Sequence, residues 1–292
     1  MRLRVVAALA AGITVAALAS NGWAADADLS AAQIVEKNVA ARGGLEAWRK
    51  IQTMVWVGHM ESAHAPVPSM LFVLQQKRPN KTRFDVNALG EKSERIFDGA
   101  RGWKVKPSRQ GGADVQPFNF EEVKFAHATQ VIDGPLIDCL AKGNVVTLQG
   151  LDDVDGRKAY HLNVRLASGE IDQVWIDAQT FLDIRYDRPS SSATGPGTVS
   201  VSYRDYKKTE GLQIPSIIET GVGSGVTPDR MVIERVMLNV SIEDRSFKPP
   251  GGRDRRAGMS MGAQPQAPMR RAPIDSSATP GASSPDPASG PK

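Results

Sequence analysis

Short runs that alternate apolar and polar residues recur every ten to fifteen residues between Thr53 and Asn239. Tyr160, Leu162 and Val164, for example, alternate with small or polar neighbours, which is the pattern of a half-buried strand. Gly, Pro, Asn and Asp separate the runs and predict turns. The runs predicted as strands are Thr53–Glu61, Ser69–Gln76, Lys81–Val86, Glu91–Phe97, Gly102–Lys106, Asn144–Gln149, Arg157–Leu166, Glu170–Ile176, Leu182–Arg188, Thr198–Tyr206, Leu212–Thr220 and Met231–Asn239.

These runs predict a mainly β (α+β) fold, an antiparallel curled sheet covered by a few helices. A sheet of this kind must curl or close to protect its edges. Its concave side then offers an apolar surface that can bind a ligand. The Ser/Gly/Pro stretch Pro189–Gly197 is predicted as a loop between two of the strands.

Two helices are predicted before the first strand, Ser30–Arg42 and Leu45–Lys50. Ser30 is a candidate N-cap with Gln33 three residues later as its capping-box partner. Gly43 ends the first helix, because glycine readily takes the left-handed conformation found after helix C-termini. The apolar stripe of this helix consists of Ile34, Val35, Val39 and Ala40.

A third helical region, Phe118–Ala141, interrupts the series of strands. Gly134-Pro135 is expected to stop its first helix, and Leu136–Leu140 to add another turn. The residues at helical spacing are Phe120, Val123, Ala126, His127 and Gln130. Its position in the middle of the sheet sequence makes this region a candidate lid.

The two ends of the chain differ from the strand-rich middle. Residues 1–24 have a basic start and a short apolar run, Val5–Leu18, and we interpret them as a secretory signal peptide cleaved after Ala24. No cysteine lies near that position, so no lipid anchor is expected there. Residues 25–248 are predicted to form one domain. Residues 249–292 are rich in Pro, Ser and Gly and are expected to be a disordered tail.

Composition narrows the covalent links and the partners that are expected. Cys139 is the only cysteine, so an intramolecular disulfide is excluded. The formal net charge is +4, but acidic and basic residues are interspersed along the strands. Nucleic-acid binding normally needs a concentrated basic face, so no nucleic-acid partner is expected.

Three motifs resemble sites of chemistry but lack the required context. Gly258–Gly262 matches a G-x-S-x-G elbow, yet it lies in the tail without a strand before it or a helix after it. His59, Glu61 and His64 span a strand end and a Pro-rich loop, and we interpret them as edge residues rather than metal ligands. Asp152–Gly156 lacks the rest of a calcium loop and predicts a hairpin turn. We therefore predict no catalytic residue, metal or cofactor.

Arg78 and a set of large apolar residues are the candidate binding residues. Arg78 follows an apolar strand and precedes Pro79-Asn80. It is either a solvated charge at a strand end or a multi-donor group that bonds several carbonyls of a helical lid. The apolar residues are either ordinary core or the inner face of the curled sheet. They are Trp56, Met70, Phe72, Phe84, Trp103 and Trp175.

Several segments together resemble the periplasmic lipoprotein carriers of the LolA type and the broader outer-membrane lipoprotein-sorting proteins. Lys77–Asn80 is similar to the K-R-P-N segment of the carriers, and Asp98–Pro107 to their D-G-x-x-x-W-x-x-x-P segment. Arg42–Trp48, Val174–Leu182 and Tyr203–Pro215 are similar to segments of the broader group. The resemblance covers about residues 31–239. Pro107–Asn144 departs from the carrier lid, and the tail is not part of the family pattern.

The resemblance implies a half-open barrel, closed by helices, that holds acyl chains in its hollow, with Arg78 as the residue that bonds the lid. The expected function is non-catalytic carriage of lipid or lipoprotein acyl chains through the periplasm towards the outer membrane. An inner-membrane transporter and an outer-membrane receptor are the possible protein partners. The alternatives are a periplasmic sensor of mislocalised lipids or lipoproteins that reports to a membrane partner and, less favoured, a hydrolase.

Overall fold

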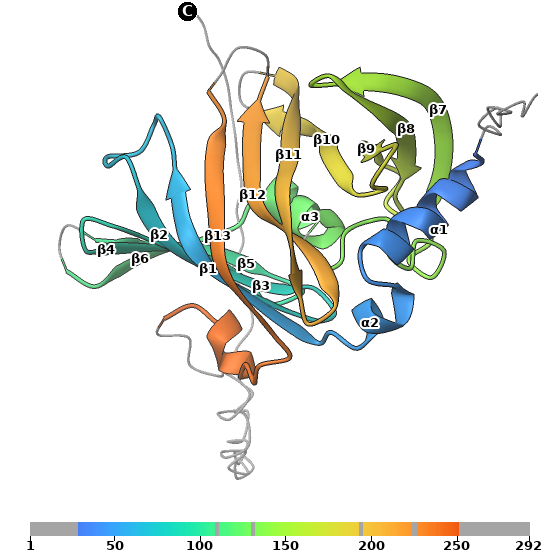
Figure 1. The fold of residues 1–292 in the computed structure, drawn as a ribbon. Helices are drawn as coiled ribbons and strands as arrows, with labels where there is room; N and C mark the ends of the chain where they lie inside the picture. The colour runs from blue at the N-terminus through green and yellow to red at the C-terminus, as the bar shows by residue number, and fades with distance from the viewer. Residues whose placement is uncertain (1–28, 109–110, 130–131, 193–194, 224–226, 251–292) are drawn as a thin grey trace, which may run out of the picture. The chain divides into compact units, whose positions relative to one another are not determined.

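Thirteen strands of the computed structural model form one antiparallel sheet (Figure 1). The structure describes residues 29–108, 111–129, 132–192, 195–223 and 227–250. The first six strands are β1 (Thr53–Glu61), β2 (Met70–Lys77), β3 (Lys81–Ala88), β4 (Glu91–Phe97), β5 (Gly102–Pro107) and β6 (Ala113–Pro117). The other seven are β7 (Val145–Val154), β8 (Arg157–Arg165), β9 (Ile171–Asp177), β10 (Asp183–Ser192), β11 (Gly195–Thr209), β12 (Leu212–Val222) and β13 (Asp229–Leu238).

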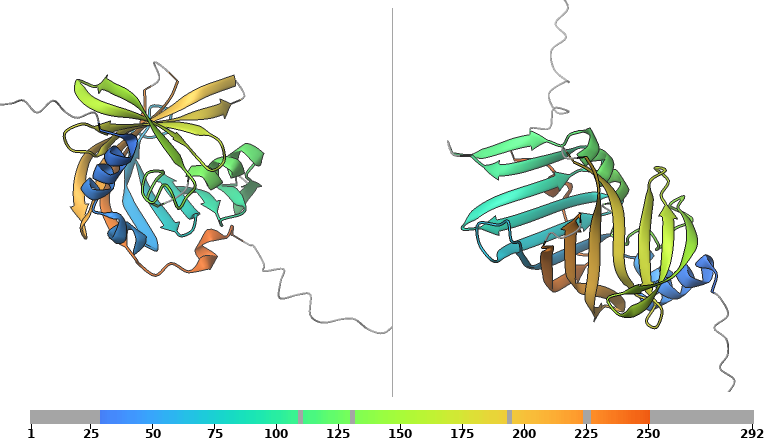
Figure 2. Two further views of the ribbon diagram at one scale, coloured as in Figure 1. Left: turned by 90° about the vertical axis from the view of Figure 1, so that its right-hand side faces the viewer. Right: turned by 90° about the horizontal axis from the view of Figure 1, so that it is seen from above.

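The sheet consists of two meanders that meet at β1 and β13. Its order is β6-β5-β4-β3-β2-β1-β13-β12-β11-β10-β9-β8-β7, so β6 and β7 are the two edges. The views in Figure 2 show these edges at the ends of two curled arms. The antiparallel curled sheet predicted from the sequence is confirmed, and it does not close into a barrel.

Four helical segments accompany the sheet in the described ranges: α1 (Ala31–Ala41), α2 (Leu45–Arg49), α3 (Phe120–Thr129) and the 3-10 helix η1 (Asp244–Phe247). Ser30 caps α1 as predicted: its hydroxyl accepts from the Gln33 amide, and the Gln33 side chain accepts from the Ser30 amide in return. None of the described helices is both long and apolar enough to cross a membrane.

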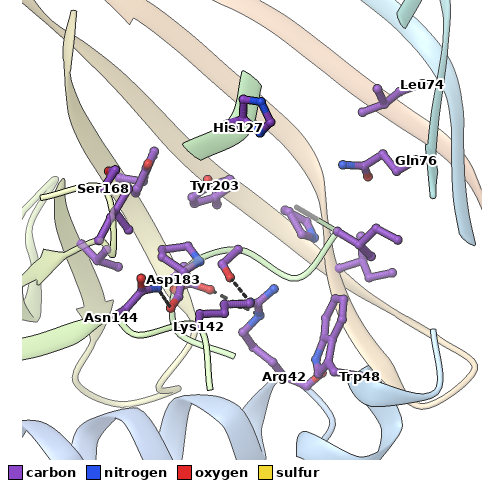
Figure 3. Close-up of a pocket in the computed structure, with 18 of the residues that line it drawn as sticks. Arg42, Trp48, Leu74, Gln76, His127, Lys142, Asn144, Ser168, Asp183 and Tyr203 are labelled. Carbon is purple, nitrogen blue, oxygen red and sulfur yellow. Dashed lines mark hydrogen bonds and ion pairs between the residues drawn. The ribbon is translucent and has the colours of Figure 1, made fainter. Parts of the chain in front are cut away.

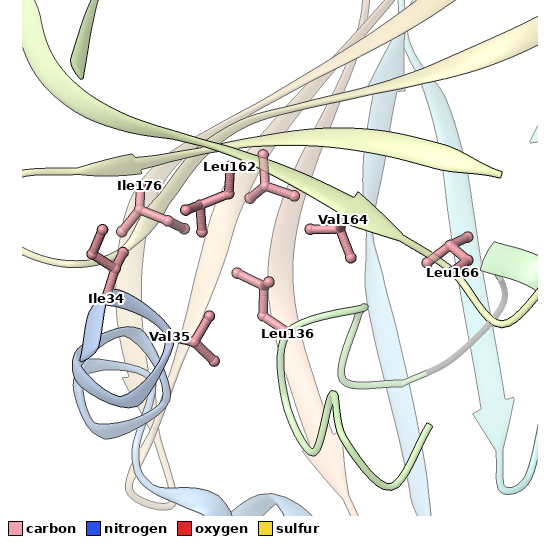
Figure 4. Close-up of a cluster of buried hydrophobic side chains, with 8 residues drawn as sticks. Ile34, Val35, Leu136, Leu162, Val164, Leu166 and Ile176 are labelled. Carbon is pink, nitrogen blue, oxygen red and sulfur yellow. The ribbon is translucent and has the colours of Figure 1, made fainter. Parts of the chain in front are cut away.

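The helix α1 packs against the inner, concave face of β8 and β9. Ile34 and Val35 of α1 contact a fully buried cluster that includes Leu162, Val164 and Ile176 (Figure 4). Leu136, from the segment between α3 and β7, belongs to the same cluster. Burial of such side chains contributes about 1.5–3 kcal/mol each relative to exposure, so this cluster fixes α1 on one arm of the sheet.

Two predicted hairpins are confirmed. Asp155-Gly156 joins β7 to β8 with both residues at positive φ, and the Asp153 carboxylate accepts from the Gly156 amide. The turn at Ser168-Gly169 joins β8 to β9, with the Leu166 amide bonded to the Glu170 carbonyl. The acidic residues before Gly156 thus have the turn role that we predicted for them.

Three expectations about the elements are corrected. The strand β6 was missed because its five residues contain one large apolar side chain, and it exists through its pairing with β5. The predicted loop Pro189–Gly197 instead carries the paired ends of β10 and β11, because backbone pairing needs no apolar pattern. In the described part of the predicted helical region Phe118–Ala141, the helix is limited to α3, and turns follow from residue 132.

The turn between β4 and β5 explains two residues of the D-G-x-x-x-W-x-x-x-P segment, Asp98 and Gly102. The Asp98 carboxylate accepts from the backbone amides of Ala100 and Arg101 at 2.9 and 2.7 Å. A Cβ atom on Gly102 would lie 1.9 Å from the ring of Phe118, which packs there against Phe97. Only glycine lets the chain before α3 approach β5 this closely.

Candidate functional site: an apolar cavity beneath a latched segment

A cavity of about 680 Å³ lies against the inner face of the sheet (Figure 3). It is covered by residues 118–144, the lid segment, of which 130 and 131 are outside the described ranges. Its size is within the range of small-molecule sites in proteins, roughly 300–1,000 Å³. The sheet contributes Trp56, Leu74, Gln76, Val174, Tyr186, Tyr203, Tyr206 and Ile214, and α3 contributes Phe120, Val123, Lys124 and His127.

Arg78 joins the turn between β2 and β3 to the lid segment. Its guanidinium donates to the carbonyls of Ile51 and Trp48 at 2.7 and 3.2 Å and to the Asp133 carboxylate at 2.6 Å. The sequence predicted bonds to several carbonyls of a lid, but the two carbonyls belong to the end of α2 and the residues after it. The contact with the lid segment is an ion pair to a carboxylate that is almost fully buried.

The Asp133 carboxylate is shared by two cations. Its second oxygen accepts from the Lys142 ammonium at 2.6 Å, and the same ammonium donates to the carbonyls of Gly134 and Ile137. Burial lowers the pKa of Lys142, while the charge and hydrogen bond of Asp133 oppose that shift. Arg42 adds a hydrogen bond to the Asp133 carbonyl at 3.1 Å. The lid segment is therefore held at Asp133 from outside by Arg78 and Arg42, while Lys142 bonds Asp133 from within the segment.

Some polar atoms of the cavity wall have no hydrogen-bond partner within the described ranges. They are the Nε1 of Trp56 and the Oε1 of Gln76, both buried. Leaving a buried polar group unpaired costs about 1–3 kcal/mol. A wall with such atoms is better suited to a ligand that carries a polar group than to a pure hydrocarbon.

Only one of the six predicted apolar residues lines this cavity. Trp56 does so from β1. Phe72 and Phe84 pack in the same hydrophobic cluster as Trp56, with their ring centroids 5.8 Å apart, and are not among the lining residues. Met70 lies opposite Met60 in the β1–β2 ladder and also does not reach the cavity.

Trp103 and Trp175 lie on the outer face, so the prediction that they share the hollow with Trp56 needs correction. Trp103 packs with Phe247 of η1, whereas its neighbour Lys104 pairs with Glu122 of α3 on the inner side. Trp175 packs with Ile184, whereas its neighbour Val174 lines the cavity. Adjacent residues of a strand face opposite sides, which separates these tryptophans from the cavity.

Sequence reasoning missed the polar residues of the cavity. Arg42 and Asp183 form an ion pair at 3.5 Å there, and burial raises the pKa values of the Tyr186 and Tyr203 hydroxyls. The Tyr186 hydroxyl donates to Asp172 at 2.6 Å. Arg42 and Tyr203 each begin a segment of the family resemblance, and that was the available signal for them. Nothing local in the sequence marked Lys142.

The other candidate motifs stay apart from this site. His59 contacts Glu234 at 2.9 Å, with Glu61 nearby, on the exposed surface of β1 and β13. Among the described residues, no group of three or more His, Cys, Asp or Glu side chains could hold a metal ion. Residues 1–24, the G-x-S-x-G motif at Gly258–Gly262 and the tail from residue 251 lie outside the described ranges.

Comparison with known proteins gives matches in structure alone. No protein-family model and no curated protein matches the sequence. The structure resembles a DUF1329 family protein from Desulfovibrio piger, with a TM-score of 0.51, 13% identity, and coverage of 75% of this chain and 97% of the other. It also matches a LolA superfamily protein from Nitrosomonas europaea, with a TM-score of 0.49, 12% identity, and coverage of 76% and 98%. At this identity the likeness to the DUF1329 family protein concerns the fold alone.

Proposed function

We propose that this protein is a non-catalytic periplasmic carrier that binds a lipid or lipoprotein acyl chain in the cavity and transfers it towards the outer membrane. The observation that supports this most directly is a largely apolar cavity under a segment latched by Arg78. Each CH₂ group moved from water into such a cavity contributes roughly 0.8 kcal/mol. The match to a LolA superfamily protein agrees with this proposal.

Binding and release are set by the lid segment. The contact between Arg78 and Asp133 favours the closed arrangement, in which the cavity walls are assembled. A ligand shifts the balance between open and closed forms only through a difference in its affinity for the two. Weakening the latch should therefore change the rate of ligand exchange.

The direct test is to isolate the exported protein and identify the molecules bound to it. The protein is purified from the periplasm, extracted with organic solvent and examined by mass spectrometry. Stoichiometric lipid is the expected result. A lipid-free protein that also fails to take up a fluorescent fatty acid or an acylated peptide would overturn the proposal.

The latch is tested by Arg78→Leu, with Lys77→Met as the matched control. Lys77 is the adjacent cation of the same motif, but it pairs with Asp244 at 2.7 Å rather than with the lid segment. We expect Arg78→Leu to speed the release of a fluorescent fatty acid, measured by stopped-flow fluorescence, while Lys77→Met leaves release unchanged. Equal release rates in the two variants, or an unfolded Arg78→Leu protein, would show that Arg78 has a structural role instead.

Transfer distinguishes a carrier from a sensor. A carrier loaded with an acylated peptide should deliver it to acceptor vesicles faster than the peptide leaves buffer alone. A protein that binds the peptide and retains it would favour the sensor alternative.

A further inference from the structure

We propose that a second cavity, beside the apolar one, binds the phosphoethanolamine head of a lipid, with Arg188 on the phosphate and Glu121 on the ammonium group. This inference rests on the proposed function, because it specifies which lipids the protein takes. Three observations support it: a polar cavity that adjoins the apolar one, an arginine in it without a polar partner, and a carboxylate without a partner beside that arginine.

The second cavity has a volume of about 410 Å³ and lies between α3 and the neighbouring ends of β9 and β10. Lys124 of α3 lines both cavities. Val174 of β9 lines the first cavity, and Asp172, two residues away, lines the second. Tyr186 and Arg188 of β10 are divided in the same way. Because residues two apart in a strand share a face, both cavities lie on the concave face and adjoin each other.

Arg188 is a cation of the second cavity without a polar partner. Its guanidinium lies over the Phe125 ring of α3, 4.0 Å from the ring centroid, and has no hydrogen-bond or ion-pair partner among the described residues. Burial lowers the pKa of Arg188, while nearby groups that include Asp172 and Glu170 oppose that shift. A guanidinium that is held against a ring and keeps its N–H groups free is suited to the forked oxygens of a phosphate.

Three of the four carboxylates that line this cavity already have partners in the protein. The pairs are Glu170 with Lys124 at 3.0 Å, Glu122 with Arg95 at 3.2 Å and with Lys104 at 3.0 Å, and Asp172 with the Tyr186 hydroxyl at 2.6 Å. Asp172 is also almost fully buried, and burial raises its pKa. A cationic group of a ligand would therefore have to displace an existing partner at each of these three carboxylates.

Glu121 is the fourth carboxylate, and it is exposed and has no hydrogen-bond or ion-pair partner in the described part of the chain. It lies four residues before Phe125 in α3, so its side chain is on the helix face over which Arg188 stacks. The hydrogen bond to Glu170, and to a smaller extent the charge of Glu121, raises the pKa of Lys124. Since the Lys124 ammonium is bonded to Glu170, Glu121 remains available to a ligand.

The two unpaired groups, one cation and one carboxylate side by side, select a head that carries both charges. The phosphate of phosphoethanolamine would bond to Arg188, and its ammonium group to Glu121. A head with a phosphate alone would place its negative charge beside Glu121 without compensation, and like charges repel. We therefore place the head group in the second cavity and the acyl chain in the apolar one, on either side of Lys124.

The test compares lipids that share a palmitoyl chain and differ in head group. Wild-type protein is titrated with lysophosphatidylethanolamine, lysophosphatidylglycerol and monopalmitoylglycerol, below their critical micelle concentrations, by displacement of a neutral fluorescent lipid. We expect the ethanolamine lipid to bind at least about tenfold more tightly than either of the others, as one charge-assisted hydrogen bond would provide.

A compound without a chain tests whether the head belongs to a lipid. Glycerophosphoethanolamine, titrated by calorimetry, should bind at least about a hundredfold more weakly than lysophosphatidylethanolamine, because it buries no CH₂ groups of an acyl chain. Equal affinities would assign the second cavity to a water-soluble phosphate ester and overturn the inference.

Variants assign the two contacts. Arg188→Met should remove the preference for lysophosphatidylethanolamine over monopalmitoylglycerol and leave the affinity for monopalmitoylglycerol nearly unchanged. Arg185→Met is the matched control and should keep the preference, because Arg185 of the same strand stacks over Trp175 on the outer face. Glu121→Gln, at an exposed position, should remove the preference over lysophosphatidylglycerol, which tests the inference even if Arg188→Met fails to fold.

Equal binding of the three lipids by the wild type, or tighter binding of lysophosphatidylglycerol, would overturn this inference and leave the proposed function standing. So would an unchanged preference in Glu121→Gln, or an equal loss of all three affinities in a folded Arg188→Met protein. Failure of the wild-type protein to bind any of the three lipids would overturn the proposed function itself.

Discussion

Trp56 and Trp175 lie on opposite faces of the same sheet and have opposite surroundings. The Trp175 indole donates to Asp152 at 2.8 Å, stacks on His161 at 4.4 Å between centroids and has Arg185 at 4.8 Å. The Trp56 indole lines the cavity, and its N–H is buried without a hydrogen-bond partner in the described ranges. The Trp175 N–H thus has a hydrogen-bond partner and the Trp56 N–H has none in the described ranges, although the Nε2 of His161 beside Trp175 is also without one. We take this difference as the sign of a binding surface.

The largest effect is expected on the outer face. Trp175→Ala should lower the free energy of unfolding by about 3–5 kcal/mol, because it removes a buried aromatic side chain together with its stack. Urea denaturation followed by circular dichroism measures this. A loss below about 1 kcal/mol would show that Trp175 is not a packing centre, and the contrast between the faces would fail.

The second effect concerns the buried network under the lid segment. Asp133→Asn should cost roughly 3 kcal/mol, because it leaves Arg78 and Lys142 without their shared carboxylate. Asp138→Asn is the matched control, since the Asp138 pair with Arg49 is far more exposed and should contribute less than about 1 kcal/mol. Equal losses of unfolding free energy in the two variants would contradict the role given to Asp133.

A third pair of variants compares the two indoles directly. Trp56→Phe removes an N–H that has no partner, so the free energy of unfolding should change by less than about 1 kcal/mol. Trp175→Phe removes the bond to Asp152 and should cost more, about 1–2 kcal/mol. Chemical denaturation of both variants tests the contrast. If Trp56→Phe destabilises the protein as much as Trp175→Phe does, the Trp56 N–H already has a hydrogen-bond partner.

The smallest effect is expected at η1, which covers the outer face near Trp103. The hydrogen bonds from Lys77 and Lys81 lower the pKa of Asp244 to about 2. The carboxylate is thus charged in the folded protein at a pH where the unfolded chain would bind a proton. Its stabilising contribution is complete above the unfolded value of 3.8 and is lost as the pH falls through about 2.

The protection of the η1 amides against hydrogen exchange, relative to their intrinsic exchange rates, measures this effect. Asp244→Asn should abolish the pH dependence of that protection between pH 4 and 2. Because the Asp244 side chain is exposed, global unfolding should change little. A pH dependence that persists in Asp244→Asn would assign the titration to another group.

Much of the fold follows from local patterns. The alternation in β8 and the capping box of Ser30 each needs only near neighbours, and both features were predicted. The ends of β10 and β11 and the edge strand β6 were not predicted, because their small and polar residues pair through the backbone alone.

The candidate site was predicted in part. Arg78 was singled out from its place after an apolar strand, and it does contact the lid segment. Its partner Asp133 lies 55 residues away, and nothing in the local pattern around either residue links them. The same holds for Lys142 and Arg42, whose buried positions depend on how the lid segment returns to β7.

The sequence by itself determined the strands that have an apolar alternation, the first helix, the turns and the presence of a large apolar surface, because these depend on periodicities of a few residues. Only the tertiary structure decided which face of each strand is concave, and hence that Trp56 lines the cavity while Trp103 and Trp175 do not. The physical reason is that alternation separates the two faces of a strand without saying which one the lid segment will cover. That choice depends on contacts between residues far apart in the chain, such as Arg78 and Asp133.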